Sequence, residues 1–492
     1  MKQVRVRMKQ VRVRIAPSPT GSDLHIGNVR TALFNYLFAK QNGGKFIFRI
    51  EDSDLARSKD EYSDSIAETL NWLGLLPDEG YKVGGEFGPY MQTRKLARYK
   101  EIIDQFIEKG LAYRCYCSQE ELTEQRNLLP EKERRTFRYP GTCRDKKNQP
   151  EDKDYVVRLR APTEGSIEWN DMVFGKMVVP NKENYDWVIM RSNGIPLYNL
   201  GCAIDDYDQK ITHIIRGRDH TINTNIQIIM HQLLGSQEIK YCHLPMMLGQ
   251  DGAKLSKRHA SVSISEYREA GYTPAAILNY LSRFGWGSGN QEIFSMEDLL
   301  AKFSLEACGK NDGKFDSKKF AAIQFEHLKN PLLTPDDEYV ERLIPFLQKK
   351  GLLDIDPAKI RAALPLIRPR AHTLVEAADE IVPFVSSDEI PLQDYKNVPE
   401  KVKQTVQTLL SEFDADHSWS ETHLRDLTKN WLAKNELGLK DLGGFMRLSL
   451  TGRSHSPELF QVMVALGRQQ SLKRLAMGLG HLQALDNPAE QR

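Results

Sequence analysis

Residues 17–28, PSPTGSDLHIGN, place a histidine and a glycine where a Pro- and Gly-rich turn leads into a predicted helix. A helix N-terminus offers unpaired N–H groups and a positive dipole, and both favour phosphate. Gly27 lets the backbone approach a ligand closely, and the His25 imidazole can hydrogen-bond developing negative charge. The stretch predicts a phosphate site; the alternative is a capped helix start with a surface histidine.

Residues 252–263, GAKLSKRHASVS, are a second stretch suited to phosphate. Lys254 and Lys257 lie three residues apart in a short loop that begins with glycine, and Arg258 follows. Two mobile ammonium groups fit a departing pyrophosphate, whereas a solvated basic loop is the alternative. Neither GxxxxGK[ST] nor GxGxxG occurs, which disfavours a P-loop or a dinucleotide site.

The elements that must position these loops alternate between strand and helix. Apolar residues at helical spacing follow each of two predicted strands, and this order predicts a parallel βαβ unit. The four elements in chain order are residues 11–15, 29–42, 45–51 and 60–74. The same alternation returns with a strand over 211–219 and a helix over 221–235.

Between these two halves lie about a hundred residues of different character, which predict an insertion into an α/β nucleotide-binding fold. Strand signals fade after about residue 260, and the remaining patterns are helical. The length of 492 residues allows about three domains. No run reaches the ~18 apolar residues of a membrane span, and the N-terminus is not a secretory signal. We therefore expect a cytoplasmic protein.

Charge and cysteine content narrow the possible partners. The net charge of +2 does not by itself indicate nucleic acid, so a polyanion would have to meet local basic patches. The six cysteines are too sparse for a disulfide framework. Three of them cluster in the insertion, which raises the question of a metal site.

The HIGN turn after the first strand and the KLSKR loop after the last strand resemble the HIGH and KMSKS signatures of class I aminoacyl-tRNA synthetases. Within that class the chain resembles the bacterial glutamyl-tRNA synthetase family over essentially residues 8–492. The stretches that carry this resemblance are VRIAPSPTG, FRIEDSDLARS, GPYMQTRK, GIPLYNLGCAIDDYDQKITHIIRGRDH, KLSKRHASVS and SLTGRSHSPELFQVMVALG.

The resemblance implies an α/β fold class, with a split Rossmann-like catalytic domain, an inserted acceptor-binding domain and α-helical stem-contact and anticodon-binding domains. The catalytic halves are expected at 8–91 and 199–260, around the insertion at 92–198. The stem-contact domain is expected at 261–333 and the anticodon-binding region at 334–492. Residues 1–7, MKQVRVR, repeat as residues 8–14 and are interpreted as an N-terminal extension.

Glutamate carries two carboxylates and one ammonium, so the implied pocket needs two cations and one anion. Arg14 and Arg216 lie at family-matching positions, and the planar guanidinium binds two carboxylate oxygens at once. Glu51 is expected to bind the ammonium, with a surface pair to Arg49 as the alternative. A site built on charge rejects neutral glutamine. The other implied contacts are Ala16, Ser18, Tyr198 and Cys202, the last of which has packing as its alternative.

The implied reaction uses ATP and Mg²⁺ to convert L-glutamate to glutamyl-adenylate. The substrate α-carboxylate attacks the α-phosphorus, while Mg²⁺ and Lys257 stabilise pyrophosphate. His25, Gly27, Asn28 and Lys257 are the implied ATP contacts, and His25, Lys254 and Lys257 the catalytic residues. The glutamyl group then passes to the 2′-hydroxyl at the end of tRNA(Glu). The resemblance further implies that activation requires bound tRNA, and we expect a monomer.

Several positions depart from the family pattern. Asn28 replaces the second histidine of HIGH, and one extra residue precedes His25. Arg218 stands in GRDH where relatives commonly have GEDH, so no ribose contact is assigned to it. Asn225 and Phe445 each replace a usual proline.

Cys115, Cys117 and Cys143 resemble the thiol ligands of a zinc site that some relatives carry in the insertion. Asp145 occupies the position of the usual histidine ligand, and Tyr139 is the alternative fourth ligand. Three thiolates with one carboxylate are an uncommon zinc set. Three reduced structural cysteines are the alternative interpretation.

Arg370, in RPRAHTL, lies where relatives place an arginine that contacts the last anticodon base. An ordinary arginine at a helix end is the alternative, and charging of tRNA(Gln) stays open. A nucleotidyltransferase without tRNA would end near residue 260–300, and a tRNA-binding regulator would have eroded signatures. Glutaminyl-tRNA synthetase is disfavoured by Arg14 in RIAPSPTG and by the helical C-terminal half.

Overall fold

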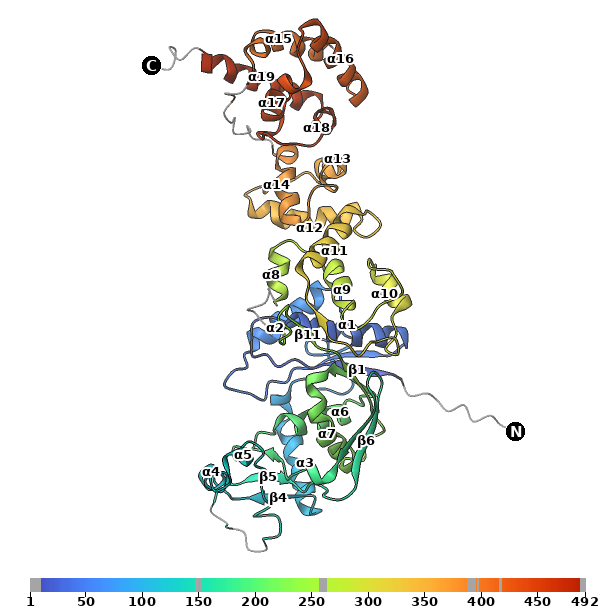
Figure 1. Cartoon of the computed structure of the whole chain (residues 1–492), viewed down its shortest axis with the longest axis vertical. Helices are drawn as coiled ribbons and strands as arrows, with labels where there is room; N and C mark the ends of the chain where they lie inside the picture. Colours follow the sequence, from blue (N-terminus) through green and yellow to red (C-terminus); the bar gives the residue numbers. More distant parts are fainter. Residues whose placement is uncertain are drawn as a thin grey trace, which may run out of the picture. The chain divides into compact units, whose positions relative to one another are not determined.

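The computed structural model describes residues 10–146, 150, 153–255, 263–386, 395, 398–415 and 418–486. The chain divides into two compact units. The first comprises Met1–Arg268 and Pro274–Phe320, and the second comprises Glu269–Thr273 and Ala321–Arg492. Figure 1 labels most of the helices and some of the strands.

The predicted βαβ unit is confirmed at the start of the first unit (Figure 1). Strand β1 (Arg12–Ile15) pairs in parallel with β2 (Lys45–Phe48), and β2 pairs in parallel with β3 (Glu79–Gly80). Helix α1 (Ile26–Gln41) connects β1 to β2, and α2 (Asp60–Trp72) connects β2 to β3. All four residues of β1 are buried. Helix α1 packs against this strand, while Arg12 pairs with Glu79 and Arg14 with Asp206 of α6.

A second, four-stranded sheet has the order β7-β6-β10-β9. Strands β6 (Ser166–Asp171), β9 (His213–Gly217) and β10 (Lys240–Leu244) run parallel, and β7 (Gly175–Pro180) is antiparallel to β6. The Thr212 N–H donates to the Arg12 carbonyl, and the Arg12 N–H donates to Thr212 Oγ1, which brings β1 beside the start of β9. The two predicted halves of the α/β fold therefore meet. Helices α6 (Tyr198–Asp208) and α7 (Thr221–Leu233) pack with them.

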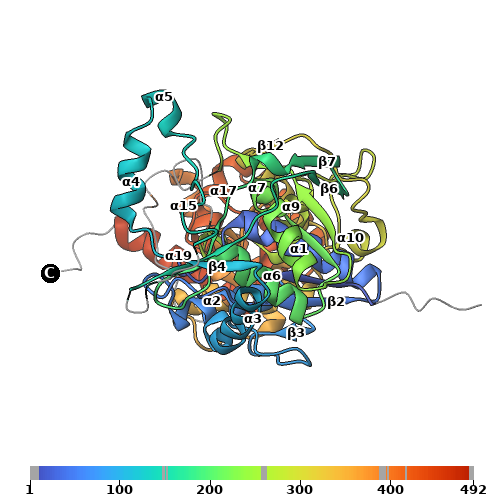
Figure 2. The same ribbon diagram turned by 90° about the horizontal axis from the view of Figure 1, so that it is seen from below.

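The hairpin of β6 and β7 differs from the predicted domain division. We expected residues 166–180 inside the insertion, yet β6 joins the sheet of the second catalytic half through Tyr241 and Asp171. The rest of the insertion is built around a separate antiparallel sheet with the order β4-β5-β8. Its elements are α3 (Leu96–Glu108), β4 (Ala112–Cys115), α4 (Gln119–Asn127), α5 (Glu131–Arg134), β5 (Val156–Leu159) and β8 (Val188–Met190). Helices α4 and α5 bury no residue and lie at the edge of this unit (Figure 2).

Short elements complete the first unit. Strand β11 (Met247–Leu248) pairs in parallel with β12 (Gly313–Lys314), so the segment before the KLSKR loop is held by residues more than sixty positions later. The remaining elements are η1 (Gln92–Lys95), η2 (Asn181–Glu183), η3 (Arg218–His220), α8 (Ile264–Glu269), α9 (Pro274–Ser282) and α10 (Met296–Lys302). The division between the two units falls within α11 (Ser317–Lys329), after Phe320.

The second unit is helical throughout the part that the structure describes, as predicted. Its helices share one apolar core that includes Tyr339, Trp431 and Phe445. They are α12 (Asp336–Lys349), α13 (Pro357–Ile367), α14 (Leu374–Val385), α15 (Glu400–Ala415), α16 (Glu421–Lys434), α17 (Leu439–Thr451), α18 (Leu459–Leu466) and α19 (Arg468–Asp486). Among the described residues, no helix combines the length and apolarity needed to cross a membrane.

Candidate active site

A pocket of about 280 Å³ lies where the carboxyl ends of β1 and β9 meet the N-terminus of α1. Ligands of open α/β sheets bind at such strand ends, so the location agrees with the predicted chemistry. Most of the residues predicted for catalysis, ATP and glutamate line this one pocket. They are Arg14, Ala16, His25, Gly27, Asn28, Glu51, Tyr198, Arg216 and Lys254.

Two of the predicted residues that the structure describes, Ser18 and Cys202, are not among those lining the pocket. Ser18 is exposed on the turn, and Cys202 is buried behind Arg14, with its Sγ 3.8 Å from Arg14 Nη2. Lys257 lies outside the described residues. The predicted packing alternative for Cys202 thus agrees with its complete burial.

His25 caps helix α1 at the edge of the pocket. Its Nδ1 accepts a hydrogen bond of 3.0 Å from the Gly27 N–H, which leaves the ring proton on Nε2. Burial and the nearby Lys254 ammonium lower the pKa of His25, so the imidazole is neutral at pH 7. A side chain on Gly27 would lie 3.2 Å from this ring nitrogen. The turn therefore presents a neutral donor beside free helix N–H groups.

Lys254 reaches the rim of the same pocket. Its Nζ lies 2.7 Å from Asp219 Oδ2, and both side chains are partly exposed. Burial is the largest single influence and would raise the pKa of Asp219, but the hydrogen bond and charge of Lys254, together with smaller contributions from its surroundings, outweigh burial and lower that pKa. Asp219 stands in the GRDH stretch that carries the family resemblance, and it was not among the residues predicted for the site.

Arg14 points into a buried ionic cluster. Its Nε and Nη2 lie 3.1 and 3.3 Å from the two carboxylate oxygens of Asp206, on α6. Arg49 Nη1 lies 2.8 Å from the same Asp206, and Arg49 Nη2 lies 3.0 Å from Glu51 Oε1. All four side chains are less than a tenth exposed, so the Glu51–Arg49 pair is not a surface pair. No partner for Arg14 Nη1 is found among the described residues.

Arg216 is held differently, by neutral acceptors. Its Nη1 donates to Gln227 Oε1 at 2.7 Å, its Nη2 donates to Thr224 Oγ1 at 2.8 Å, and its Nε lies 3.3 Å from His243 Nε2. Within the part of the chain that the structure describes, no carboxylate forms an ion pair with it. The guanidinium is 5% exposed and therefore faces the pocket with an unneutralised charge.

Tyr198 completes the wall between these arginines. Its Oη lies 3.2 Å from His220 Nδ1, and burial raises the pKa of the phenol well above its usual range. Burial, together with the Arg216 charge, lowers the pKa of His220 to about 4. Both groups are therefore neutral at pH 7 and act as hydrogen-bonding partners, not as charges.

Arg218, the departure from GEDH, has a clear local partner. Its Nη2 lies 2.8 Å from Asp312 Oδ2, and Asp312 Oδ1 also accepts the backbone N–H of Met246 at 2.8 Å. The cation thus connects η3 to the segment around Asp312, and it does not line the pocket.

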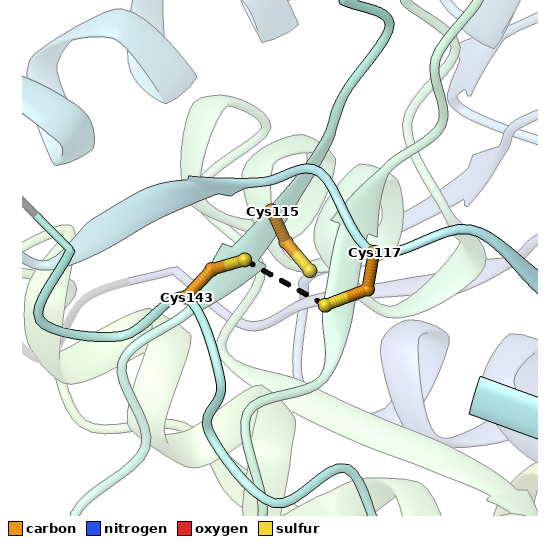
Figure 3. Close-up of side chains that lie close together, drawn as sticks. All are labelled: Cys115, Cys117 and Cys143. Carbon is orange, nitrogen blue, oxygen red and sulfur yellow. Dashed lines mark hydrogen bonds between the residues drawn. The ribbon is translucent and has the colours of Figure 1, made fainter. Parts of the chain in front are cut away.

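The cysteine cluster lies at the end of β4 and in the turn that contains Cys143 (Figure 3). The sulfurs of Cys115, Cys117 and Cys143 all lie within 4.8 Å of one another, and those of Cys117 and Cys143 are 3.6 Å apart. Tyr139 Oη lies 3.4 Å from Cys115 Sγ and accepts the Cys143 N–H at 2.7 Å.

Asp145 is not brought to the three thiols. Its side chain is 83% exposed, and its Oδ1 lies 2.9 Å from Arg160 Nη1. The carboxylate therefore forms an ion pair at the surface and is not part of the thiol cluster. The predicted alternative, Tyr139, does contact the cluster through its hydroxyl.

Arg370, in the second unit, lines a pocket of about 230 Å³ with Arg453 and His455. Its Nε lies 3.1 Å from Glu380 Oε2, and its side chain is 41% exposed. Two arginines at one concave site suit a nucleic-acid base or phosphate.

Comparisons with known proteins agree with this geometry. Residues 10–322 match the catalytic domain of the class I tRNA synthetases (E and Q), and residues 338–479 match an anticodon-binding domain. A glutamate–tRNA ligase of Anaeromyxobacter sp. (strain Fw109-5) is 40% identical, covering 95% of this chain and 98% of that relative. One from Geobacter sulfurreducens is 39% identical and covers 97% and 100%.

A solved structure is similar along nearly the whole chain. It is the crystal structure of a glutamate tRNA ligase from Elizabethkingia meningosepticum in complex with its amino acid, with a TM-score of 0.80 and 28% identity. The match covers 96% of this chain and all of that one. The chain therefore belongs to the glutamate–tRNA ligase family of class I aminoacyl-tRNA synthetases.

Proposed function

We propose that this protein is a glutamate–tRNA ligase, which activates L-glutamate with ATP and transfers it to the 3′ end of tRNA(Glu). The observation that carries the proposal is the pocket of the first unit, where Arg14, Arg216 and Glu51 converge beside the N-terminus of α1. Two guanidinium groups and one carboxylate match the charges of glutamate, and the helix N-terminus suits the phosphates of ATP.

Each charged group of glutamate is assigned a side chain of opposite charge in the pocket. Arg216, which pairs with no carboxylate among the described residues, takes one substrate carboxylate, and the Nη1 edge of Arg14 takes the other. Glu51 receives the ammonium. Burial raises the pKa of Glu51 despite Arg49, so a bound ammonium favours its ionised form. Tyr198 adds a neutral hydroxyl donor.

Mg²⁺-bound ATP lies against His25, Gly27 and Asn28, so that its α-phosphorus meets the substrate carboxylate. Lys254 and Lys257 stabilise the departing pyrophosphate, as loop ammonium groups can. Lys254 must exchange Asp219 for phosphate, and a partly exposed pair of this kind costs little to separate. The reaction therefore depends on positioning and charge, with little acid–base chemistry.

The partner of the second unit is proposed to be the anticodon of tRNA(Glu), read in part by Arg370. Its pocket with Arg453 supports this assignment. Cytoplasmic location and a monomeric state stay predictions.

Purified protein should charge tRNA(Glu) with glutamate in the presence of ATP and Mg²⁺, and it should discriminate against glutamine by a large factor because a neutral amide leaves an arginine unmatched. Acid-precipitable radiolabelled glutamate measures the product, and parallel reactions with tRNA(Gln) test tRNA choice. Failure to charge either tRNA with glutamate would contradict the proposal.

We also propose that the three thiols of the insertion hold zinc. Four ligands at the usual zinc–sulfur distance of about 2.3 Å stand about 3.8 Å apart in a tetrahedron. The separation of 3.6 Å between Cys117 and Cys143 fits that edge. Tyr139 is the fourth ligand that the contacts favour, and zinc would fix the chain around β4.

Dialysed protein should contain about one zinc per chain, and Cys117→Ser should remove most of it because a hydroxyl is a poor substitute for a thiolate. Cys308→Ser is the control, since Cys308 is likewise a free cysteine but lies outside the cluster. Elemental analysis measures the content. Tyr139→Phe and Asp145→Ala then identify the fourth ligand, and zinc far below one per chain in the unmodified protein excludes the site.

A further inference from the structure

A buried chain of side chains lies behind Arg216, on the side away from the pocket. Asp171 Oδ2 lies 2.6 Å from His243 Nδ1, and His243 Nε2 lies 3.3 Å from Arg216 Nε. Asp171 and His243 come from β6 and β10, and both side chains are 1% exposed. None of the roles assigned above uses either residue.

We propose that Asp171 and His243 are positioning residues that hold Arg216 in the orientation needed for the substrate carboxylate. This inference rests on the proposed role of Arg216 in binding glutamate. The pair does not touch the substrate; it acts through the guanidinium.

The carboxylate of Asp171 is itself rigidly placed. Its Oδ1 accepts the backbone N–H groups of Val173 and Phe174, each at 3.0 Å, in the turn between β6 and β7. Its Oδ2 also accepts the backbone N–H of His243 at 3.2 Å. An ionised carboxylate can only accept hydrogen bonds, so at 2.6 Å from Asp171 Oδ2 the His243 Nδ1 must be the donor.

This requirement sets the tautomer of His243. The ring proton stays on Nδ1, where Asp171 accepts it, and Nε2 is left as an acceptor. That acceptor faces Arg216 Nε and lies 3.1 Å from Thr224 Oγ1. Thr224 Oγ1 in turn accepts from Arg216 Nη2. The three nitrogens of the Arg216 guanidinium are thus each held by one side chain: Nε by His243, Nη2 by Thr224 and Nη1 by Gln227. Together these contacts fix the plane of the guanidinium.

The Asp171–His243 pair also leaves the charge of Arg216 available to a substrate carboxylate. A carboxylate that pairs directly with a guanidinium occupies some of its N–H donors, as Asp206 does at Arg14. At Arg216 the carboxylate stands one imidazole farther away, so it orients the cation without occupying the donors that meet the substrate. The structure thus uses two different supports for its two pocket arginines.

Asp171→Asn is the sharpest test because it is isosteric. With the amide oxygen on the N–H groups of Val173 and Phe174, the NH₂ meets His243 Nδ1 and forces the ring proton to Nε2, against Arg216 Nε–H. KM for glutamate should rise about 10- to 100-fold, which is the loss of a charge-assisted hydrogen bond, and KM for ATP should change less than about 3-fold.

His243 variants give an independent series. Gln can present an acceptor towards Arg216 and Leu cannot, so KM for glutamate should rise more in His243→Leu than in His243→Gln. His213→Gln is the matched control: His213 is buried on β9 near Thr212 and Phe38, and it does not touch Arg216. Its KM for glutamate should match the unmodified protein. If Asp171→Asn does not fold, this series alone decides.

Arg216→Ala separates the two levels of the argument. If it leaves KM for glutamate unchanged, the proposed role of Arg216 is wrong. If it raises that KM while Asp171→Asn and His243→Leu do not, the site stands and the positioning pair is overturned. The double variant Asp171→Asn/Arg216→Ala should be no worse than Arg216→Ala, and additive losses would likewise contradict action through Arg216.

Discussion

Replacing Arg14 by alanine should lower kcat/KM for glutamate by about 100-fold or more, which is ~3 kcal/mol of binding. The change removes the guanidinium edge that faces the pocket. It also leaves Asp206 with one buried cationic partner fewer, close to the place where a substrate carboxylate must bind. Charging of tRNA(Glu) at varied glutamate and ATP concentrations measures the effect, and the KM for glutamate should carry most of it.

Arg12→Ala provides the matched control. Arg12 lies two residues earlier on the same strand and is also buried, but it pairs with Glu79 through two hydrogen bonds of 2.8 Å and does not line the pocket. The control should be less stable to heat and keep its KM for glutamate. Equal increases of KM in both variants would indicate a general loosening of β1, and the role proposed for Arg14 would then be wrong.

The framework of the site was predictable because its signals are local. Apolar spacing over residues 29–42 predicts a helix, and the structure has α1 at Ile26–Gln41. The helix end is also a local signal, because Gly43, two residues after Gln41, has a φ of 56°, a backbone conformation that favours glycine. Once β1, α1 and β9 are placed, His25, Arg14 and Arg216 converge by topology alone.

The partners of those residues were not predictable in the same way. Asp206 is 192 positions from Arg14, and Asp171 is 72 positions from His243. No periodicity or spacing within one element indicates such contacts. A buried charge does require a partner, but the sequence offers 66 acidic residues and does not say which one is near.

Competition among side chains explains the difference at Asp145. The spacing of the motif placed this residue at a ligand position, whereas the structure pairs it with Arg160 at the surface. The spacing of residues in a motif determines where the backbone passes. The direction of the Asp145 side chain then depends on nearby cations from other segments, here Arg160. The domain division at β6 has a similar origin, because a strand joins whichever sheet edge its neighbours leave open.

Asp206→Asn should destabilise the first unit by about 3–5 kcal/mol at pH 7, since it removes the charge shared by two buried guanidinium groups. Asp208→Asn is the control on the same helix. Asp208 pairs with Lys95 and Arg98 but is 20% exposed, so its loss should cost about 1 kcal/mol or less. Urea unfolding measured by circular dichroism compares the two variants.

The pH dependence makes this prediction specific to the Asp206 charge. Burial alone would raise the pKa of Asp206, but Arg14 and Arg49 outweigh burial and hold it well below its ordinary value of 3.8. As the pH falls, the unfolded chain therefore binds a proton at this residue before the native protein does. The stability that the carboxylate contributes is complete above about pH 5 and declines below about pH 4. The difference between the unmodified protein and Asp206→Asn should accordingly shrink from pH 7 to pH 3. A constant difference would mean that shape, and not charge, makes Asp206 important.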